Sequence, residues 1–331
     1  MAIHPRSFTT PSVYQSSTTS QVTIQPAHQP NSKMSLPSFT ATYHSTPYSS
    51  ISPLKPSLST SNKTILITGG GSGLGPFIAR AFAESGASKI VLFGRTHSTL
   101  LDTKSSIESL FPHCTVLPLT VDISSQSQIT SAFSTAIAQF GPIHILISNA
   151  AALPPLSPIS SLSPADLTSA LQTNVLGPLF LIQAFLSRES NPADHKTLIN
   201  ISTAAIHNPP MIPGMAAYAA TKAATGKLVE AVASEYVENE VMVLSVHPGM
   251  LATDMARKIG EEVGKMGFGD LPAMQMDDPQ MSANFMVWAS SPEARFLRGK
   301  FVWANWDVDE MMVKKEEIVG GSNLTVGLLG L

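Results

Sequence analysis

A run of glycines at residues 69–75 is the feature that most constrains how this chain can fold. The run Gly-Gly-Gly-Ser-Gly-Leu-Gly is separated from the strand-like segment 64–67 by Thr68 alone and precedes a segment with helical character, 76–85. A glycine-rich loop between a strand and a helix can turn tightly, approach a bound anion closely and present the unpaired N–H groups of the helix start. The loop therefore predicts a site for the pyrophosphate of a dinucleotide, with contacts from Gly69, Ser72, Gly73, Leu74 and Gly75.

Strand-like and helix-like segments alternate along the chain from Lys63 onward. The expected strands are residues 64–67, 89–93, 115–119, 143–147, 197–201, 241–246 and 301–303. The expected helices are residues 76–85, 98–110, 124–140, a long helix that begins near Ser163, and 216–236. This alternation is typical of right-handed βαβ units, so we expect an α/β domain with a doubly wound parallel sheet of about seven strands and helices on both faces.

Residues 1–62 differ in composition from the rest of the chain. They contain no Asp or Glu, are rich in Ser, Thr and Pro, and carry only three basic residues, Arg6, Lys33 and Lys55. Residues 63–331 therefore hold 17 basic against 23 acidic residues, a net charge of −6. Because so polar a segment cannot bury enough apolar surface to fold alone, we expect a disordered tail (1–62) and one folded domain (63–331). Met34 marks an alternative start of the chain.

Charge and cysteine content narrow the classes of partner. The net charge of −3 for the whole chain gives no reason to expect a nucleic-acid surface. Cys114 is the only cysteine, which excludes an internal disulfide and a cysteine-rich zinc site. No metal is expected, and a cytoplasmic location is favoured. No segment reaches the ~18 uninterrupted apolar residues of a membrane span. Organelle targeting by the Ser/Thr-rich tail stays open as an alternative.

The end of the second expected strand bears on the choice of dinucleotide. NAD-binding domains usually place an Asp or Glu there to hold the ribose hydroxyls. This chain has Gly94-Arg95 at that point and no acidic residue between Glu84 and Asp102. A guanidinium can hold a 2′-phosphate through paired, charge-assisted hydrogen bonds, so NADP is favoured over NAD. Asp122, after the third strand, is a candidate for the adenine amino group, with a helix cap as the alternative.

Tyr218 and Lys222 are four residues apart within the long expected helix 216–236, so both lie on one helix face. A nearby ammonium favours phenolate over phenol and lowers the pKa of a tyrosine from its usual value of about 10. The pair therefore predicts general acid/base chemistry on a carbonyl or an alcohol. After residue 62 the only other tyrosine is Tyr236, which has Glu240 at the corresponding spacing.

Taken together, the motifs resemble the classical short-chain dehydrogenase/reductase family over residues 63 to about 310. In order they are Thr68-Gly69-x-x-x-Gly73-x-Gly75, Asp122, Asn149-Ala150, Asn174, Ser202-Thr203, Tyr218-x-x-x-Lys222 and Pro248-Gly249-x-x-x-Thr253. The resemblance implies a single-domain Rossmann fold. Two further segments, Phe39–Tyr48 and Trp303–Asp307, are similar to pieces of fungal members that have an N-terminal extension.

The resemblance implies a role for each matching residue. Tyr218 would donate or accept the proton, while Lys222 would bind the nicotinamide ribose and lower the pKa of Tyr218. Asn174 would hold a water of the proton relay through its backbone. Thr253 would bond the carboxamide and orient the hydride face.

Two positions depart from the usual pattern of this family. Asn149 would secure the central strand, although Ser148 and Ala151 replace the usual Asn and Gly beside it. The hydroxyl that polarises the substrate carbonyl is usually the second of two serines, and here the pair is Ser202-Thr203. Because side chains alternate along a strand, only one of the two can face the site. The alignment favours Thr203, and Ser202 is the alternative.

The residues expected to flank the reacting end of the cofactor are rich in methionine. They are Met211, Met215, Met250, Met255, Met266, Met274 and Met276. Flexible thioethers suit an irregular apolar ligand, which favours a lipophilic ketone or secondary alcohol as substrate, with a role in secondary metabolism; filling of the core is the alternative. The resemblance also implies a homodimer or homotetramer. A catalytically silent NADP-binding sensor or scaffold is the rival function, disfavoured because the catalytic residues are all present.

Overall fold

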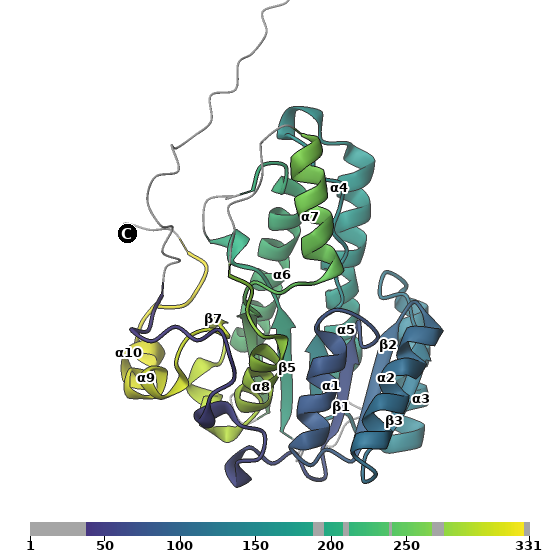
Figure 1. The fold of residues 1–331 in the computed structure, drawn as a ribbon, viewed down its shortest axis with the longest axis vertical. Coiled ribbons are helices and arrows are strands. Elements are labelled where there is room, and N and C mark those ends of the chain that lie inside the picture. Colours follow the sequence, from purple (N-terminus) through teal and green to yellow (C-terminus); the bar gives the residue numbers. More distant parts are fainter. Residues whose placement is uncertain (1–37, 188–194, 208–211, 238–239, 267–274, 328–331) are drawn as a thin grey trace, which may run out of the picture. The chain divides into compact units, whose positions relative to one another are not determined.

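The computed structural model describes residues 38–187, 195–207, 212–237, 240–266 and 275–327 (Figure 1). Its seven strands form one parallel sheet in the order β3-β2-β1-β4-β5-β6-β7. Their bounds are β1 Thr64–Thr68, β2 Lys89–Gly94, β3 Thr115–Thr120, β4 Ile145–Ser148, β5 Lys196–Ile201, β6 Val241–His247 and β7 Phe301–Trp303. The prediction of a doubly wound parallel sheet is confirmed.

Helices cover both faces of this sheet. Their bounds are α1 Gly75–Glu84, α2 His97–Leu110, α3 Gln126–Phe140, α4 Pro164–Leu171, α5 Gly177–Leu186, α6 Ala216–Glu235, α7 Asp254–Lys265, α8 Pro279–Ala289, α9 Val308–Val313 and α10 Lys315–Gly320. On one face α1 packs against α2 and α8, and on the other α5 packs against α3 and α6 (Figure 1). The strand order reverses between β1 and β4, and in such sheets ligands bind beyond the carboxyl ends of the strands at this switch point.

The four central strands are apolar because both of their faces are covered. Leu66, Leu146, Leu198 and Val243 are neighbours in register across β1, β4, β5 and β6, and each is fully buried. These four side chains belong to one core cluster with residues of α3, α5 and α6. A parallel sheet buried on both faces requires such near-continuous apolar strands, which is why the strands were predictable from sequence.

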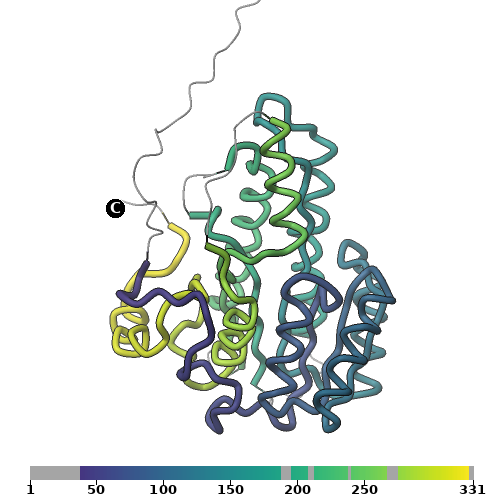
Figure 2. Tube along the Cα trace, in the orientation of Figure 1, coloured from purple at the N-terminus to yellow at the C-terminus, as the bar shows by residue number. Residues whose placement is uncertain are grey.

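The expected disorder of the N-terminal tail is wrong for residues 38–62, which we call the N-terminal arm. The arm contains two 3₁₀ turns, Ser49–Ile51 and Pro56–Leu58, and buries Ile51 and Leu58 almost completely. Figure 2 shows it, in purple, running beside the yellow C-terminal segment. The arm is ordered because it packs against α8 and α9 instead of folding alone. Residues 1–37, including Met34, lie outside the described residues.

Candidate active site

The glycine-rich loop joins β1 to α1 in the conformation that its sequence predicts. Gly69 and Gly73 have positive φ angles of 66° and 56°. A Cβ atom on Gly75 would lie 2.1 Å from the carbonyl oxygen of Gly69, so this position has no room for a side chain. No side chain caps the start of α1. The glycines of the loop 69–75 therefore present backbone groups without side chains next to an uncapped helix start. This arrangement, which we call the cradle, fits the pyrophosphate of a dinucleotide.

Asn149 fastens the end of β4 to this loop. Its side-chain amide donates to the carbonyl oxygen of Thr68 at 2.9 Å. In return, the hydroxyl of Thr68 accepts the N–H groups of Asn149 and Ala150 at 3.0 and 2.9 Å. These bonds hold the two strands together at the switch point, and the unusual neighbours Ser148 and Ala151 leave them intact.

Arg95 and Asp122, at the ends of the neighbouring strands β2 and β3, lie close enough for the charge of Arg95 to act on Asp122. Arg95 is exposed after β2 and forms no ion pair within the described part of the chain. Asp122 accepts both the N–H and the hydroxyl of Ser124, at 2.9 and 2.7 Å, and these bonds, helped by the charge of Arg95, hold its pKa below the ordinary value. Asp122 thus caps its own loop, while Arg95 is exposed to solvent at the end of β2.

Tyr218 and Lys222 lie one turn apart on α6, and both are buried. The ammonium of Lys222 donates to the carbonyl oxygen of Ile201 at 2.8 Å and lies 6.0 Å from the centroid of the Tyr218 ring. Burial raises the pKa of Tyr218 to about 12 and lowers the pKa of Lys222 to about 8. The expected lowering of the tyrosine pKa is therefore not found in the protein alone, because desolvation of the phenol outweighs the effect of an ammonium that is turned toward Ile201.

Asn174 lies in a π-helical turn, Gln172–Leu176, which interrupts the long helix expected from Ser163. Pro178 stands four residues after Asn174 and has no N–H to donate to its carbonyl. That carbonyl instead accepts the hydroxyl of Thr225, at 2.5 Å. The side chain of Asn174 bonds the peptide groups of Ala152 at 2.8 and 2.9 Å. The carbonyl of Asn174 is thus satisfied in part by a side chain of the neighbouring helix α6.

Thr225 is a site residue that the sequence motifs did not reveal. It is almost fully buried on α6, one turn beyond Lys222, and connects that helix to the π-helical turn. The proline at the fourth position after Asn174 was the available signal, since it predicts a carbonyl that needs a donor from elsewhere.

The two candidate hydroxyls at the end of β5 have different surroundings. Ser202 is buried, and its Oγ has no hydrogen-bond partner among the described residues. Thr203 is half-buried, and its hydroxyl accepts the N–H of Ala205 at 3.3 Å. Because accepting a bond leaves the hydroxyl proton free, Thr203 can still donate to a substrate carbonyl, and it is the more accessible of the two.

Thr253 joins the cradle to α7. Its hydroxyl caps α7 by accepting the N–H of Ala256 at 3.3 Å. Its methyl group is the nearest atom to the place where a Cβ of Gly73 would lie, at 3.8 Å. The turn after β6 therefore reaches the glycine-rich loop.

An apolar cluster covers Tyr218. Its buried members are Leu156, Met215, Tyr218 and Val263, and Met255 and Met266 pack against them. The cluster is formed by α7, the loop after β4 and the first residues of α6 with those just before it, and three of the predicted methionines, Met215, Met255 and Met266, lie around Tyr218. Met250 is half-buried and Met276 is exposed. Met211 and Met274 lie outside the described residues.

Comparison with known proteins gives matches over most of the chain. A family profile for short chain dehydrogenases matches residues 63–264. A short chain dehydrogenase/reductase of Claviceps purpurea is 32% identical over 298 residues, which are 89% of this chain and 96% of the relative. This coverage is more than residues 63–331 can supply, so the match includes part of the segment before Lys63.

Solved structures share the fold. A short chain dehydrogenase from Burkholderia cenocepacia, in complex with NADP, has a TM-score of 0.65 and 22% identity and covers 75% of this chain and 98% of its own. A 3-ketoacyl-(acyl-carrier-protein) reductase from Brucella melitensis, complexed with NADH, also has a TM-score of 0.65 and 22% identity, and covers 74% of this chain and 97% of its own. At this identity the likeness is one of fold alone.

Proposed function

The chain belongs to the short-chain dehydrogenase/reductase family, and on that premise we propose that it is an NADP(H)-dependent oxidoreductase that interconverts a ketone and a secondary alcohol. The observation that carries the proposal is the position of Tyr218 and Lys222, one helical turn apart beneath an apolar cluster. A buried acid/base pair, beside a loop suited to a dinucleotide, suits proton transfer coupled to hydride transfer.

Different residues of this chain provide the proton, the hydrogen bond and the apolar surroundings that reduction of a carbonyl requires. Bound NADPH supplies the hydride. With a pKa of about 12, Tyr218 is protonated at neutral pH and is ready to give its proton to the carbonyl oxygen. Thr203 donates a hydrogen bond to the same oxygen, and the cluster around Tyr218 excludes water. The apolar lining favours a lipophilic substrate, such as those of secondary metabolism.

The test is turnover with a defined cofactor. The purified chain is incubated with NADPH, and separately with NADH, against a panel of apolar ketones, and the absorbance of the reduced cofactor is followed. Ketone-dependent oxidation of NADPH supports the proposal. Tight NADPH binding without turnover over a broad panel would instead favour the silent sensor or scaffold.

Arg95 is expected to set the preference for NADPH. Replacing it by serine should weaken NADPH binding about 10- to 100-fold and leave NADH binding within about threefold, because a hydrogen-bonded charge pair contributes about 1.5–3 kcal/mol. The dissociation constants of both cofactors are measured by calorimetric titration. Arg80→Ser, at an exposed arginine on α1, is the control. An unchanged ratio of the two constants in Arg95→Ser would contradict the assignment.

A groove between α5 and α6 supports assembly into a homodimer or homotetramer. Its aliphatic lining consists of Leu179, Ile182, Leu186, Leu228, Ala231 and Val232. Within the described residues, one helical stretch, 164–186, is long and apolar enough to cross a membrane, but only 39% of its most apolar window is buried in the protein. An apolar helix face next to a groove is typical of a surface that pairs with a second copy.

Leu228→Arg is therefore expected to convert the assembled protein to a monomer, because it places a charge in the centre of a buried apolar contact. The molar mass is measured by light scattering after size-exclusion chromatography. Leu110→Arg, at an exposed leucine on α2, should leave the mass unchanged. A wild-type protein that is monomeric at high concentration would refute the assignment of this surface.

A further inference from the structure

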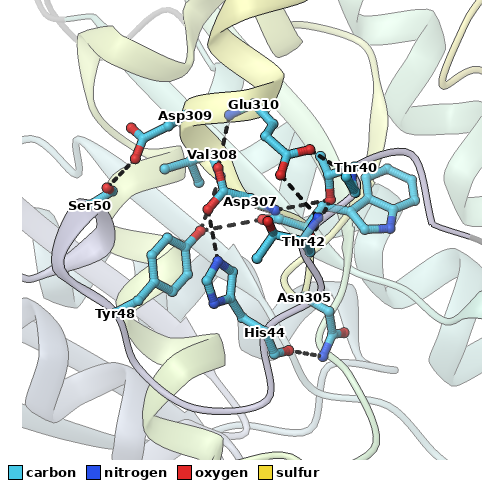
Figure 3. Close-up of polar contacts among 12 residues, drawn as sticks. Thr40, Thr42, His44, Tyr48, Ser50, Asn305, Asp307, Val308, Asp309 and Glu310 are labelled. Atoms are coloured by element: carbon cyan, nitrogen blue, oxygen red, sulfur yellow. Dashed lines mark hydrogen bonds and ion pairs between the residues drawn. The ribbon is translucent and has the colours of Figure 1, made fainter.

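The segments Phe39–Tyr48 and Trp303–Asp307 take no part in the proposed chemistry, yet they lie against each other (Figure 3). Tyr43 and Trp306 form an antiparallel bridge. The backbone N–H of His44 donates to the carbonyl oxygen of Asn305 at 2.7 Å, and the side-chain amide of Asn305 donates to the carbonyl oxygen of His44 at 2.9 Å. Asn305 thus bonds the arm through both its backbone and its side chain.

Side chains on both segments reinforce this contact. The imidazole of His44 stacks on the ring of Tyr48, with 3.6 Å between centroids, and its Nε2 lies 2.8 Å from the carboxylate of Asp307. The carboxylate of Glu310 accepts the N–H groups of Ala41 and Thr42 at 2.6 and 3.0 Å. The arm is therefore held by a dense set of polar contacts that involve its own peptide groups.

From Asn305 the contacts continue to the turn after β6. The side chain of Asn305 is fully buried and lies beside Gly249, as does the carboxylate of Asp277, which is itself only 6% exposed. Asp277 holds both peptide groups of Met250: its carboxylate accepts the N–H at 2.7 Å, and its own N–H donates to the carbonyl at 2.8 Å. The buried carboxylate of Asp277 therefore holds the backbone of the turn, beside the side chain of the arm-bound Asn305.

The backbone of the turn packs closely against the side chains of Asp277 and Asn305 at Gly249. The φ of Gly249 is +91°, and a Cβ atom there would lie 2.5 Å from the carboxylate of Asp277 and 3.2 Å from the side chain of Asn305. The turn continues to Thr253, which faces Gly73 of the glycine-rich loop. A second contact with the arm lies alongside, because the N–H of Asp278 donates to the carbonyl oxygen of Ser45 at 2.8 Å.

We propose that Asn305 and Asp277 are positioning residues that hold the turn 248–251 against the cofactor site, and that the N-terminal arm completes this support. The inference rests on the proposed function, because it assigns the turn to the nicotinamide end of a dinucleotide. Loss of the Asn305 side chain leaves an unfilled space beside Gly249 and Asp277, so the buried carboxylate and the turn that it holds are free to shift. Such a shift releases Met250 and moves Thr253 relative to Gly73, and displacements of about 1 Å at such positions cost up to about 100-fold in rate.

The test compares Asn305→Ala with two other variants. His44→Ala keeps Asn305 but removes the imidazole ring that stacks on Tyr48 and contacts the carboxylate of Asp307. Ser50→Ala removes a hydrogen bond between the arm and Asp309, away from the turn, and is the matched control. Amide hydrogen exchange of residues 248–256 is measured without cofactor, and the Kd, KM and kcat are measured with NADPH.

We expect Asn305→Ala to speed exchange in residues 248–256 and to raise the Kd and KM for NADPH at least about tenfold, with a smaller change in kcat. His44→Ala should also speed exchange in residues 248–256 and should raise the Kd and KM for NADPH by about threefold. If Asn305→Ala does not fold, the result for His44→Ala tests the proposal. Ser50→Ala should match the wild type. Unchanged exchange, or faster exchange with unchanged NADPH affinity, would overturn the inference. A wild-type chain that binds neither cofactor would instead refute the proposed function, while the exchange data would still report whether the support exists.

Discussion

Replacing Tyr218 by phenylalanine is expected to lower kcat by about 100- to 10,000-fold, the range that a positioned general acid contributes. Phenylalanine keeps the ring that packs with Leu156, Met215 and Val263 and removes only the hydroxyl. The packing and the affinity for NADPH should therefore hold, the latter within about threefold. The measurement is single-turnover oxidation of NADPH with a ketone that the wild type reduces, beside a titration of cofactor binding.

The chain offers a matched control for this substitution. Tyr236 lies at the other end of the same helix, at the C-cap of α6, and Tyr236→Phe should leave kcat unchanged. If Tyr218→Phe retained more than about a tenth of the wild-type kcat, another group would have to supply the proton, and the assignment of Tyr218 would be lost. If it lost NADPH binding as well, its role would be structural.

The sheet and the cradle were predictable because their signals are local. A buried parallel strand has to be apolar over its whole length, and the turn at Gly75 has to be free of a Cβ, so both constraints are visible in a few consecutive letters. The ordered structure of the N-terminal arm is not predictable from its composition, because composition describes a segment in isolation and the arm is ordered by contacts with a distant part of the chain. Its partners Asn305, Asp307 and Glu310 are more than 250 positions away in the chain.

The electrostatics of the site were less predictable than its residues. Spacing placed Tyr218 and Lys222 on one face of a helix, and the structure agrees. The direction of the tyrosine pKa depends on how deeply the phenol is buried and on where the ammonium donates its hydrogen bond. Both are tertiary properties: the carbonyl that Lys222 bonds belongs to Ile201, 21 positions earlier.

Lys222→Met is expected to abolish turnover and, at neutral pH, to stabilise the fold. Lys222 is 4% exposed, and burial lowers its pKa from 10.5 to about 8. A shift of this size corresponds to a cost of about 3 kcal/mol for keeping the buried ammonium charged. Methionine removes that cost and loses one hydrogen bond to Ile201, which contributes about 1 kcal/mol. The charge effect is the larger, so the free energy of unfolding should rise by about 2 kcal/mol at pH 7.

The pH dependence separates this explanation from a simple gain in packing. Below pH 8 the lysine is protonated in both states, so the full cost is present in the wild type. Between pH 8 and 10.5 the unfolded state binds the extra proton, so the stability of the wild type rises with pH and the advantage of Lys222→Met disappears. Above pH 10.5 only the lost hydrogen bond remains, and the variant should be about 1 kcal/mol less stable than the wild type. Urea unfolding at pH 7 and at pH 10 measures both values. Lys227→Met, at a half-exposed lysine on the same helix, should change stability by less than about 0.5 kcal/mol at either pH. An advantage of Lys222→Met that stays constant with pH would show that packing, and not the buried charge, sets the stability at this position.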